Sequence, residues 1–421
     1  MNPPGQASAP FAWLRELTRS ERRTCTAAVG GWALDAMDVQ IYSFVIPTLI
    51  MVWGITRADA GAIATGALLS SAVGGWLGGW MSDRFGRVRT LQVSILWFAF
   101  FTLVSGLARN ANELLWARTL MGLGFGGEWA AGSVLLGETM RAQHRGKALG
   151  FMQAGWALGW AAAAIFNAII FSIWPPEFAW RALFFVGITP AILVFFLRRL
   201  VSEPEVYRES RRQIAEQGGA KPSVLEIFRP PLLRVTLLGG LVGTGAQGGY
   251  NAISTWLPTY LKAERHLSIL DSTGYLIVLI AGTFCGYVAG GYISDWLGRR
   301  RAFLTFGISA GIVILAYTKL PISNGAMLVL GFPLGFAAAG VFSGMGAFYT
   351  EQFPTRVRGV GQGFSYNLGR AVGALFPALV GSLSGRMGLG SAIGAFAFGA
   401  YAVMAVAAYL LPETRGKALD A

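Results

Sequence analysis

Five charged side chains stand inside stretches of sequence that are otherwise almost entirely apolar. They are Asp35, Asp38, Arg118, Glu128 and Arg370. A charge at the centre of a bilayer costs about 2.5–3.5 kcal/mol or more, so such residues usually mark a pathway. Carboxylates can bind and release protons, and a guanidinium offers paired donors to an organic anion. These residue types therefore predict proton and anion binding.

The two aspartates lie three residues apart, which places them on one face of a helix. Two neighbouring carboxylates disfavour the doubly ionised state, and burial disfavours it further. At least one of Asp35 and Asp38 is therefore expected to exchange a proton near neutral pH. An alternative stays open, in which both aspartates only pair with Arg118 to hold two helices together. Against a purely architectural role, the residue equivalent to Arg118 in the second half of the chain is Gly331.

Glu128 is expected at nearly the same depth as Asp35. Asp35 lies ten residues, or about 15 Å of helix, from the start of its apolar stretch, and Glu128 lies about nine residues from the end of its own. The glycines around Glu128 allow another helix to approach closely. Glu128 is then either a second protonatable group or the partner of a buried cation.

Arg370 lies about thirteen residues inside the eleventh apolar stretch. No acidic residue occupies the core of the apolar stretches in the second half of the chain, so we expect Arg370 to bind the carboxylate of a substrate. Polar and aromatic side chains on other apolar stretches complete the predicted substrate site, which comprises Arg370, Arg118, Gln153, Trp156, Gln247, Tyr250, Asn251, Tyr366 and Asn367.

The elements that must position these side chains are membrane-spanning helices. The 421 residues are 54% hydrophobic and 13% charged, about half the charge of a soluble protein. Twelve apolar stretches of 18 or more residues are each long enough to cross a bilayer as a helix. They begin near Cys25, Asp59, Val88, Glu113, Lys147, Trp180, Val235, Ser272, Arg301, Ala326, Gly359 and Leu389. The sequence predicts an all-α polytopic membrane protein with twelve transmembrane helices.

The net charge of +13 reports membrane topology. With the N-terminus in the cytoplasm, 25 of the 34 Lys and Arg residues fall in cytoplasmic segments. This is the positive-inside pattern, and it places both termini in the cytoplasm. A nucleic-acid partner is therefore not expected, and the two cysteines exclude a disulfide scaffold.

The chain repeats itself at half its length, which predicts two pseudo-symmetric six-helix halves. Asp83 and Asp295 stand in matching GGWMSDRFGRVR and GGYISDWLGRRR segments, 212 residues apart. The resulting domains are a cytoplasmic segment at 1–24, the N-terminal half at 25–200, a linker at 201–231, the C-terminal half at 232–411 and a tail at 412–421.

The same repeated segments predict a cytoplasmic gate built from carboxylates and guanidinium groups. Exposed pairs are worth only about 0–1 kcal/mol, which suits a latch that must open. The alternative is that these charges only enforce topology and cap helices. The predicted gate residues are Asp83, Arg87, Glu138, Asp295, Arg299 and Glu351.

These motifs resemble the major facilitator superfamily. Its G-x-x-x-D-x-x-G-R-x-R pattern occurs twice, ending at Arg89 and Arg301, its R-x-x-x-G-x-G-x-G pattern starts at Arg118, and the LPETRGK segment near the C-terminus resembles that of sugar and organic-ion porters. The D-x-x-D pair and the G-G-E-W and Y-N-L-G-R segments are similar to those of aromatic acid, sialate and lactate-type proton symporters. The resemblance implies alternating access, proton-coupled uptake and a monomer.

The sequence thus predicts a proton symporter that imports a small organic carboxylate, an aromatic one included, across a bacterial inner membrane. Alternatives are a proton-driven exporter of organic acids or drugs, a sugar or metabolite porter, and, more remotely, a sensor or membrane enzyme. Against an enzyme, His144 and His266 are expected in loops, and no nucleophile–base cluster or metal-ligand spacing is present. The expected driving force is the proton gradient, with no cofactor or metal.

Overall fold

The computed structural model describes residues 12–188, 224–230, 232–353 and 358–414. The first half of the described chain contains η1 (Ala12–Arg15), α1 (Arg19–Trp53), α2 (Arg57–Phe85), α3 (Arg87–Leu107), α4 (Ala111–Thr139), α5 (Ala142–Ile173) and α6 (Pro176–Val186). The second half contains η2 (Val224–Phe228), α9 (Leu232–Ala263), α10 (Ile269–Leu297), α11 (Arg299–Lys319), α12 (Asn324–Gln352), α13 (Arg358–Gly373), α14 (Phe376–Met387) and α15 (Leu389–Leu410).

The architecture is an all-helical bundle, as predicted. With α13 and α14 counted as one broken helix, the described residues form twelve α-helices, of which α6 is described over 11 residues. Nine segments of the described chain are long and apolar enough to cross a membrane by length and composition. Most of the predicted linker at 201–231 and of the tail at 412–421 lies outside the described residues.

Several helices begin before the apolar stretches do, because polar residues form their first turns. The first helix starts at Arg19, six residues ahead of the predicted Cys25. Thr18 and Glu21 form a capping box there, in which each side chain satisfies a backbone N–H of the other residue. Hydropathy detects the membrane-embedded part of a helix, whereas caps set its true start.

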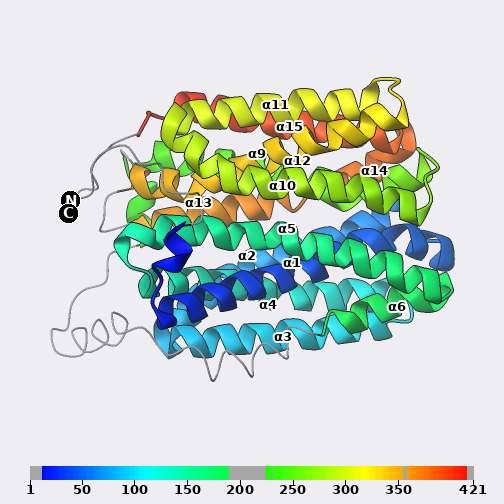
Figure 1. Ribbon diagram of the computed structural model, residues 1–421, viewed down its shortest axis with the longest axis horizontal. Coiled ribbons are helices and arrows are strands. Elements are labelled where there is room, and N and C mark those ends of the chain that lie inside the picture. Colours follow the sequence, from blue (N-terminus) through cyan, green and yellow to red (C-terminus); the bar gives the residue numbers. More distant parts are fainter. Residues whose placement is uncertain (1–11, 189–223, 231, 354–357, 415–421) are drawn as a thin grey trace.

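The two halves lie side by side along the length of the bundle (Figure 1). Within each half, one helix pair approaches so closely that only glycine fits: α2 against α4, and α10 against α12. A Cβ atom at Gly126 of α4 would collide with the carbonyl oxygen of Ser71, and one at Gly335 of α12 with that of Leu279. Such small-residue contacts are typical of membrane helices.

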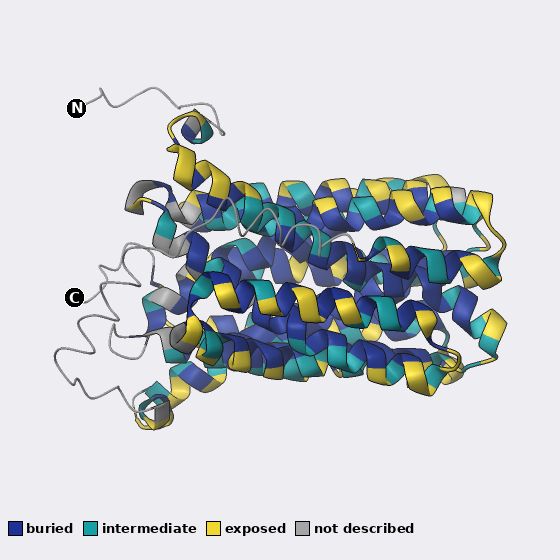
Figure 2. Ribbon diagram, turned by 90° about the horizontal axis from the view of Figure 1, so that it is seen from below, coloured by how far each residue is buried: buried dark blue, intermediate teal, exposed yellow. Residues whose placement is uncertain are grey.

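The two ends of the bundle differ. We call the end that carries Ala12 and Thr414 the terminal end, and the opposite end the distal end (Figures 1 and 2). At the distal end α2 packs along α14 across the two halves. A Cβ atom added to Gly61 would lie 2.6 Å from the carbonyl oxygen of Pro377, and the backbone N–H of Ala378 donates to Thr65 at 3.2 Å. The two halves are therefore in direct contact at the distal end.

Exposed apolar side chains cover the outside of the bundle, whereas the residues between the halves are buried (Figure 2). Trp80, for example, is 54% exposed and Phe100 is 57% exposed. So much exposed apolar surface is unfavourable in water but suits contact with lipid.

Candidate functional site

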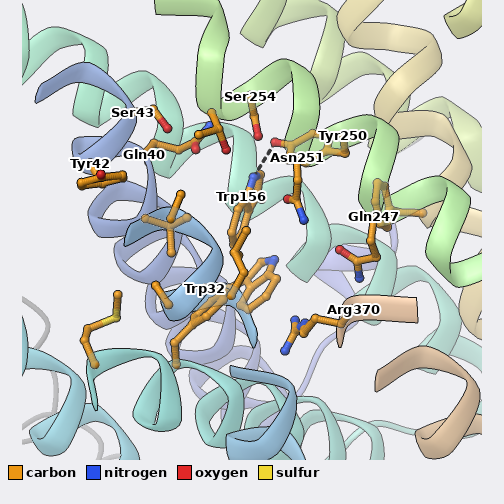
Figure 3. Close-up of a pocket in the computed structure, with 18 of the residues that line it drawn as sticks. Trp32, Gln40, Tyr42, Ser43, Trp156, Gln247, Tyr250, Asn251, Ser254 and Arg370 are labelled. Atoms are coloured by element: carbon orange, nitrogen blue, oxygen red, sulfur yellow. Dashed lines mark hydrogen bonds between the residues drawn. The ribbon is translucent and has the colours of Figure 1, made fainter. Parts of the chain in front are cut away.

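A cavity of about 840 Å³, including its open mouth, lies between the two halves (Figure 3). Helices α1, α2, α4 and α5 line it from the first half, and α9, α10, α12 and α13 from the second. Most of the predicted substrate residues line this cavity: Arg118, Gln153, Trp156, Gln247, Tyr250, Asn251, Tyr366 and Arg370.

Arg370 brings a buried positive charge to the second-half side of the cavity (Figure 3). Its residue is 4% exposed, and its guanidinium carbon lies 5.3 Å from the ring centres of both Phe125 and Tyr366. These distances fit cation–π contacts, which hold a guanidinium in place. Gln247, whose amide nitrogen has no hydrogen-bond partner in the described part of the chain, lines the same cavity. The arrangement can bind a carboxylate.

Aromatic rings from the first half form a wall of the same cavity. Trp32 of α1 stacks on Phe125 at a centroid distance of 5.9 Å and contacts Trp156 at 4.9 Å. The indole N–H of Trp156 donates to the hydroxyl of Tyr250 at 2.6 Å, so this hydrogen bond joins the two halves (Figure 3). Flat aromatic surfaces of this kind bind a planar apolar body.

Asp38 and Arg118 form a buried ion pair at the edge of this cavity. The carboxylate oxygen of Asp38 accepts a hydrogen bond from Arg118 Nη1 at 2.8 Å, and the two side chains are 0% and 2% exposed. The Arg118 guanidinium carbon also lies 5.4 Å from the ring centre of Tyr42. The pairing with Arg118, predicted as an alternative for both aspartates, is thus made by Asp38.

Asp35 has a different partner. Its carboxyl group interacts with the neighbouring carboxyl group of Glu128. Both side chains are buried, and neither Asp35 oxygen receives a hydrogen bond from a donor among the described residues. Two adjacent buried carboxylates cannot both carry a charge at low cost. This arrangement can therefore hold one proton between two carboxyl groups.

Trp32 lines two neighbouring pockets. Glu128 lines a smaller pocket between α1, α3, α4 and α5, and Trp32 lines both that pocket and the central cavity. The smaller pocket and the central cavity are therefore neighbours that share one side chain.

One predicted substrate residue was wrongly placed. Asn367 does not line the cavity: its side-chain amide donates to the carbonyl of Gly363 at 3.0 Å, and it packs against Gly75 of α2. Tyr366, one residue earlier and about 100° away around the helix, does line the cavity.

Sequence reasoning also missed part of the lining. The missed polar and aromatic residues include Trp32, Gln40, Tyr42, Ser43, Phe125, Ser254, Thr255 and Tyr287. On α1 a signal was available, because Gln40 and Ser43 recur at helical spacing from Trp32 and form a polar and aromatic stripe.

The predicted gate residues are described only in part. The side chains of Asp83, Glu138 and Asp295 lie outside the described residues. Arg299 pairs with Glu351 at 2.9 Å. This pair joins α11 to α12, both in the second half, so it does not by itself bridge the halves. The side chain of Arg87 donates to Ser82 at 3.0 Å.

The segment after α15 reinforces the same contact. The carboxylate of Glu413 accepts the backbone N–H groups of Arg299 and Arg300, at 2.8 and 3.1 Å, and thus caps α11. The hydroxyl of Thr414 donates to Glu351 at 2.6 Å. Gly298, with a φ of 93°, makes the turn that brings these groups together. The segment Leu411–Thr414 therefore holds the N-terminus of α11 against α12, a role that the sequence did not reveal.

A helical membrane bundle with a polar cavity between two halves is the architecture of a secondary transporter. No cluster of His, Cys, Asp and Glu able to hold a metal ion is present among the described side chains.

The family model of the Major Facilitator Superfamily matches residues 29–377, and the chain belongs to this superfamily of transporters. It is 40% identical over 410 residues to a probable 4-methylmuconolactone transporter of Cupriavidus pinatubonensis, covering 97% of this chain and 95% of the relative. It is 31% identical over 365 residues to a cis,cis-muconate transport protein of Acinetobacter baylyi, covering 85% and 86%.

The fold matches solved structures as well. The chain aligns with a D-xylose–proton symporter with a TM-score of 0.71 at 20% sequence identity, covering 94% of this chain and 99% of the other. The protein is thus an integral membrane transporter of the major facilitator fold, related to carriers of organic acids.

Proposed function

We propose that this protein imports a small organic carboxylate with a planar, aromatic or unsaturated body, together with protons. The observation that carries the substrate class is the position of Arg370. A buried guanidinium faces the same cavity as the aromatic wall of Trp32, Phe125 and Trp156. A ligand that satisfies both sides has a carboxylate at one end and a flat apolar body at the other.

The relatives support the same substrate class. Their printed names refer to 4-methylmuconolactone and cis,cis-muconate. A sugar would be a poorer ligand, because it offers no charge to the guanidinium group of Arg370.

Proton coupling would use two sites with different properties. The neighbouring carboxyl groups of Asp35 and Glu128 could hold one proton, and the Asp38–Arg118 pair would lose its attraction if Asp38 were protonated. One proton bound at these sites, together with one anion bound at Arg370, leaves the net charge of the cavity unchanged. The loaded carrier can then change conformation without moving an uncompensated charge through the low-dielectric interior.

The terminal end of the bundle would face the cytoplasm, as the distribution of Lys and Arg indicates. Alternating access would then rock the N-terminal half at 25–200 against the C-terminal half at 232–411, with the predicted gate residues at the cytoplasmic end. The inside-negative membrane potential, worth about 2.3 kcal/mol per charge per 100 mV, would favour inward proton movement.

Counterflow in proteoliposomes tests the substrate class. Vesicles preloaded with unlabelled benzoate should accumulate radiolabelled benzoate, and a panel of sugars should not compete. Arg370→Ala should abolish counterflow, whereas Arg386→Ala should retain it, because Arg386 is exposed and does not line the cavity. Equal counterflow in the two variants, or competition by sugars but not by carboxylates, would overturn the proposal.

A further inference from the structure

A second pocket lies at the distal end, away from the central cavity. It has a volume of about 360 Å³ including its open mouth. Helices α1 and α5 of the first half line it together with α9 and α10 of the second. Its polar lining is Thr48, Asn167, Lys262, Ser272 and Thr273, and apolar side chains that include Phe44 and Phe171 form the remaining wall.

Lys262 gives this pocket a positive charge without a matching carboxylate. It is half-buried and forms no ion pair with any residue that the structure describes. The two nearest acidic residues in sequence are engaged elsewhere. Glu264 accepts the backbone N–H groups of Leu389 and Gly390, and Asp271 accepts the hydroxyl of Ser268.

Polar groups beside the lysine are buried and available to a ligand. Ser272 is only 7% exposed, and its hydroxyl oxygen has no hydrogen-bond partner in the described part of the chain. Asn167 and Thr48 are buried as well, at 6% and 1% exposure. An unsatisfied buried hydroxyl is unfavourable, and a bound acceptor would remove that cost.

The first turn of α10 adds to the same potential. Ile269, Ser272 and Thr273, which line the pocket, belong to the N-terminal turn of a 29-residue helix. The N-terminus of a helix carries partial positive charge and favours anions. Lysine, hydroxyls, an amide and a helix N-terminus thus converge on one pocket with an apolar wall.

We propose that this distal pocket is a second binding site, for a carboxylate anion with a small apolar body. The anion would lie against Lys262 and Ser272, and its body against Phe44 and Phe171. Both halves contribute to the pocket, so the complete site exists only when the distal end is closed. An occupant therefore stabilises that conformation by its differential affinity. In the proposed orientation the distal end faces the outside of the cell. A carboxylate anion outside the cell would then favour the conformation in which the distal end is closed.

Equilibrium binding of radiolabelled benzoate to the purified protein tests the site. The measurement uses the Arg370→Ala background, so that binding in the central cavity does not contribute. We expect a saturable component that Lys262→Gln weakens on the order of tenfold or more, because a charged donor is lost. Lys319→Gln is the matched control, since Lys319 lies at the same end but donates to Ser391 outside the pocket.

Two further arms keep the result interpretable. Ser272→Ala should weaken the same component, which guards against a folding defect specific to the lysine variant. Inorganic phosphate should displace benzoate far less effectively than unlabelled benzoate does, because phosphate lacks an apolar body. No saturable binding in the Arg370→Ala protein, equal binding in the Lys262→Gln and Lys319→Gln proteins, or equal displacement by phosphate would overturn the proposal. Benzoate counterflow by the wild-type protein is a separate result, so the two proposals can fail independently.

Discussion

Replacing Asp38 by asparagine should destabilise the protein more than the same change at Asp35. Asp38 is the hydrogen-bonded carboxylate partner of Arg118 among the described residues, and Arg118 is only 2% exposed. Asp38→Asn leaves a buried cation beside a neutral amide. Breaking a buried ion pair in this way costs about 3–5 kcal/mol.

The expected fall in melting temperature follows from the length of the chain. With an unfolding entropy of about 2.1 cal/mol/K per residue, a chain of 421 residues loses roughly 1 °C for each 0.9 kcal/mol. Asp38→Asn should therefore melt about 3–6 °C below the wild type. Asp35→Asn should melt within about 1 °C of the wild type, because it mimics a carboxyl that shares a proton with Glu128.

Tryptophan fluorescence during thermal unfolding of the purified protein measures both changes. The double variant Asp38→Asn with Arg118→Gln removes both charges and should recover most of the lost stability, while losing proton-coupled uptake. If Asp38→Asn melts like the wild type, or if Asp35→Asn is equally destabilised, the assignment of the two aspartates to different partners is wrong.

Three further variants test the cavity and its closure. Arg370→Lys keeps the charge but loses the paired donors, so the KM for benzoate uptake into proteoliposomes should rise about tenfold. Tyr250→Phe removes the hydrogen bond to Trp156, worth about 0.5–1.5 kcal/mol, and should change the exchange rate by no more than about tenfold. Gly61→Leu would collide with the backbone of Pro377 and should hold the distal end open. Uptake would then stop, while a thiol reagent added from the distal side would reach cysteines placed in the cavity.

Each of these predictions has a contrasting outcome. Gly274→Leu is the control for the glycine variant, because a side chain at Gly274 would meet open space. If both leucine variants transport normally, the contact between Gly61 and Pro377 is not needed to close the distal end. An unchanged KM in Arg370→Lys would mean that a point charge suffices, and complete loss of transport in Tyr250→Phe would assign the hydroxyl a role in substrate binding.

Much of the fold could be predicted because the bilayer imposes simple rules. Apolar stretches must span it, so hydropathy located the helices to within a few residues. Asp35 and Glu128 were predicted at the same depth in the membrane by counting residues from the ends of their helices, since each residue of a helix advances about 1.5 Å. Both arguments use position along a helix axis.

Rotation about that axis was harder to predict. Asn367 was assigned to the cavity as a polar residue near Arg370, yet it packs against α2. Trp32 and Phe125 were missed, because aromatic residues are frequent on lipid-facing surfaces too, as the exposed Trp80 shows. Which partner each aspartate takes depends on how α1 and α4 are rotated against each other, and an isolated sequence does not fix that rotation.

The central claim is that substrate and protons cross together, and a pH-sensitive dye inside proteoliposomes tests it most directly. Adding benzoate outside should acidify the lumen faster than in protein-free vesicles, which report passive entry of the neutral acid. In Asp35→Asn combined with Glu128→Gln, counterflow should persist while the protein-dependent acidification is lost. Protein-dependent benzoate uptake with no acidification above that of protein-free vesicles, or unchanged acidification in the double variant, would contradict the account.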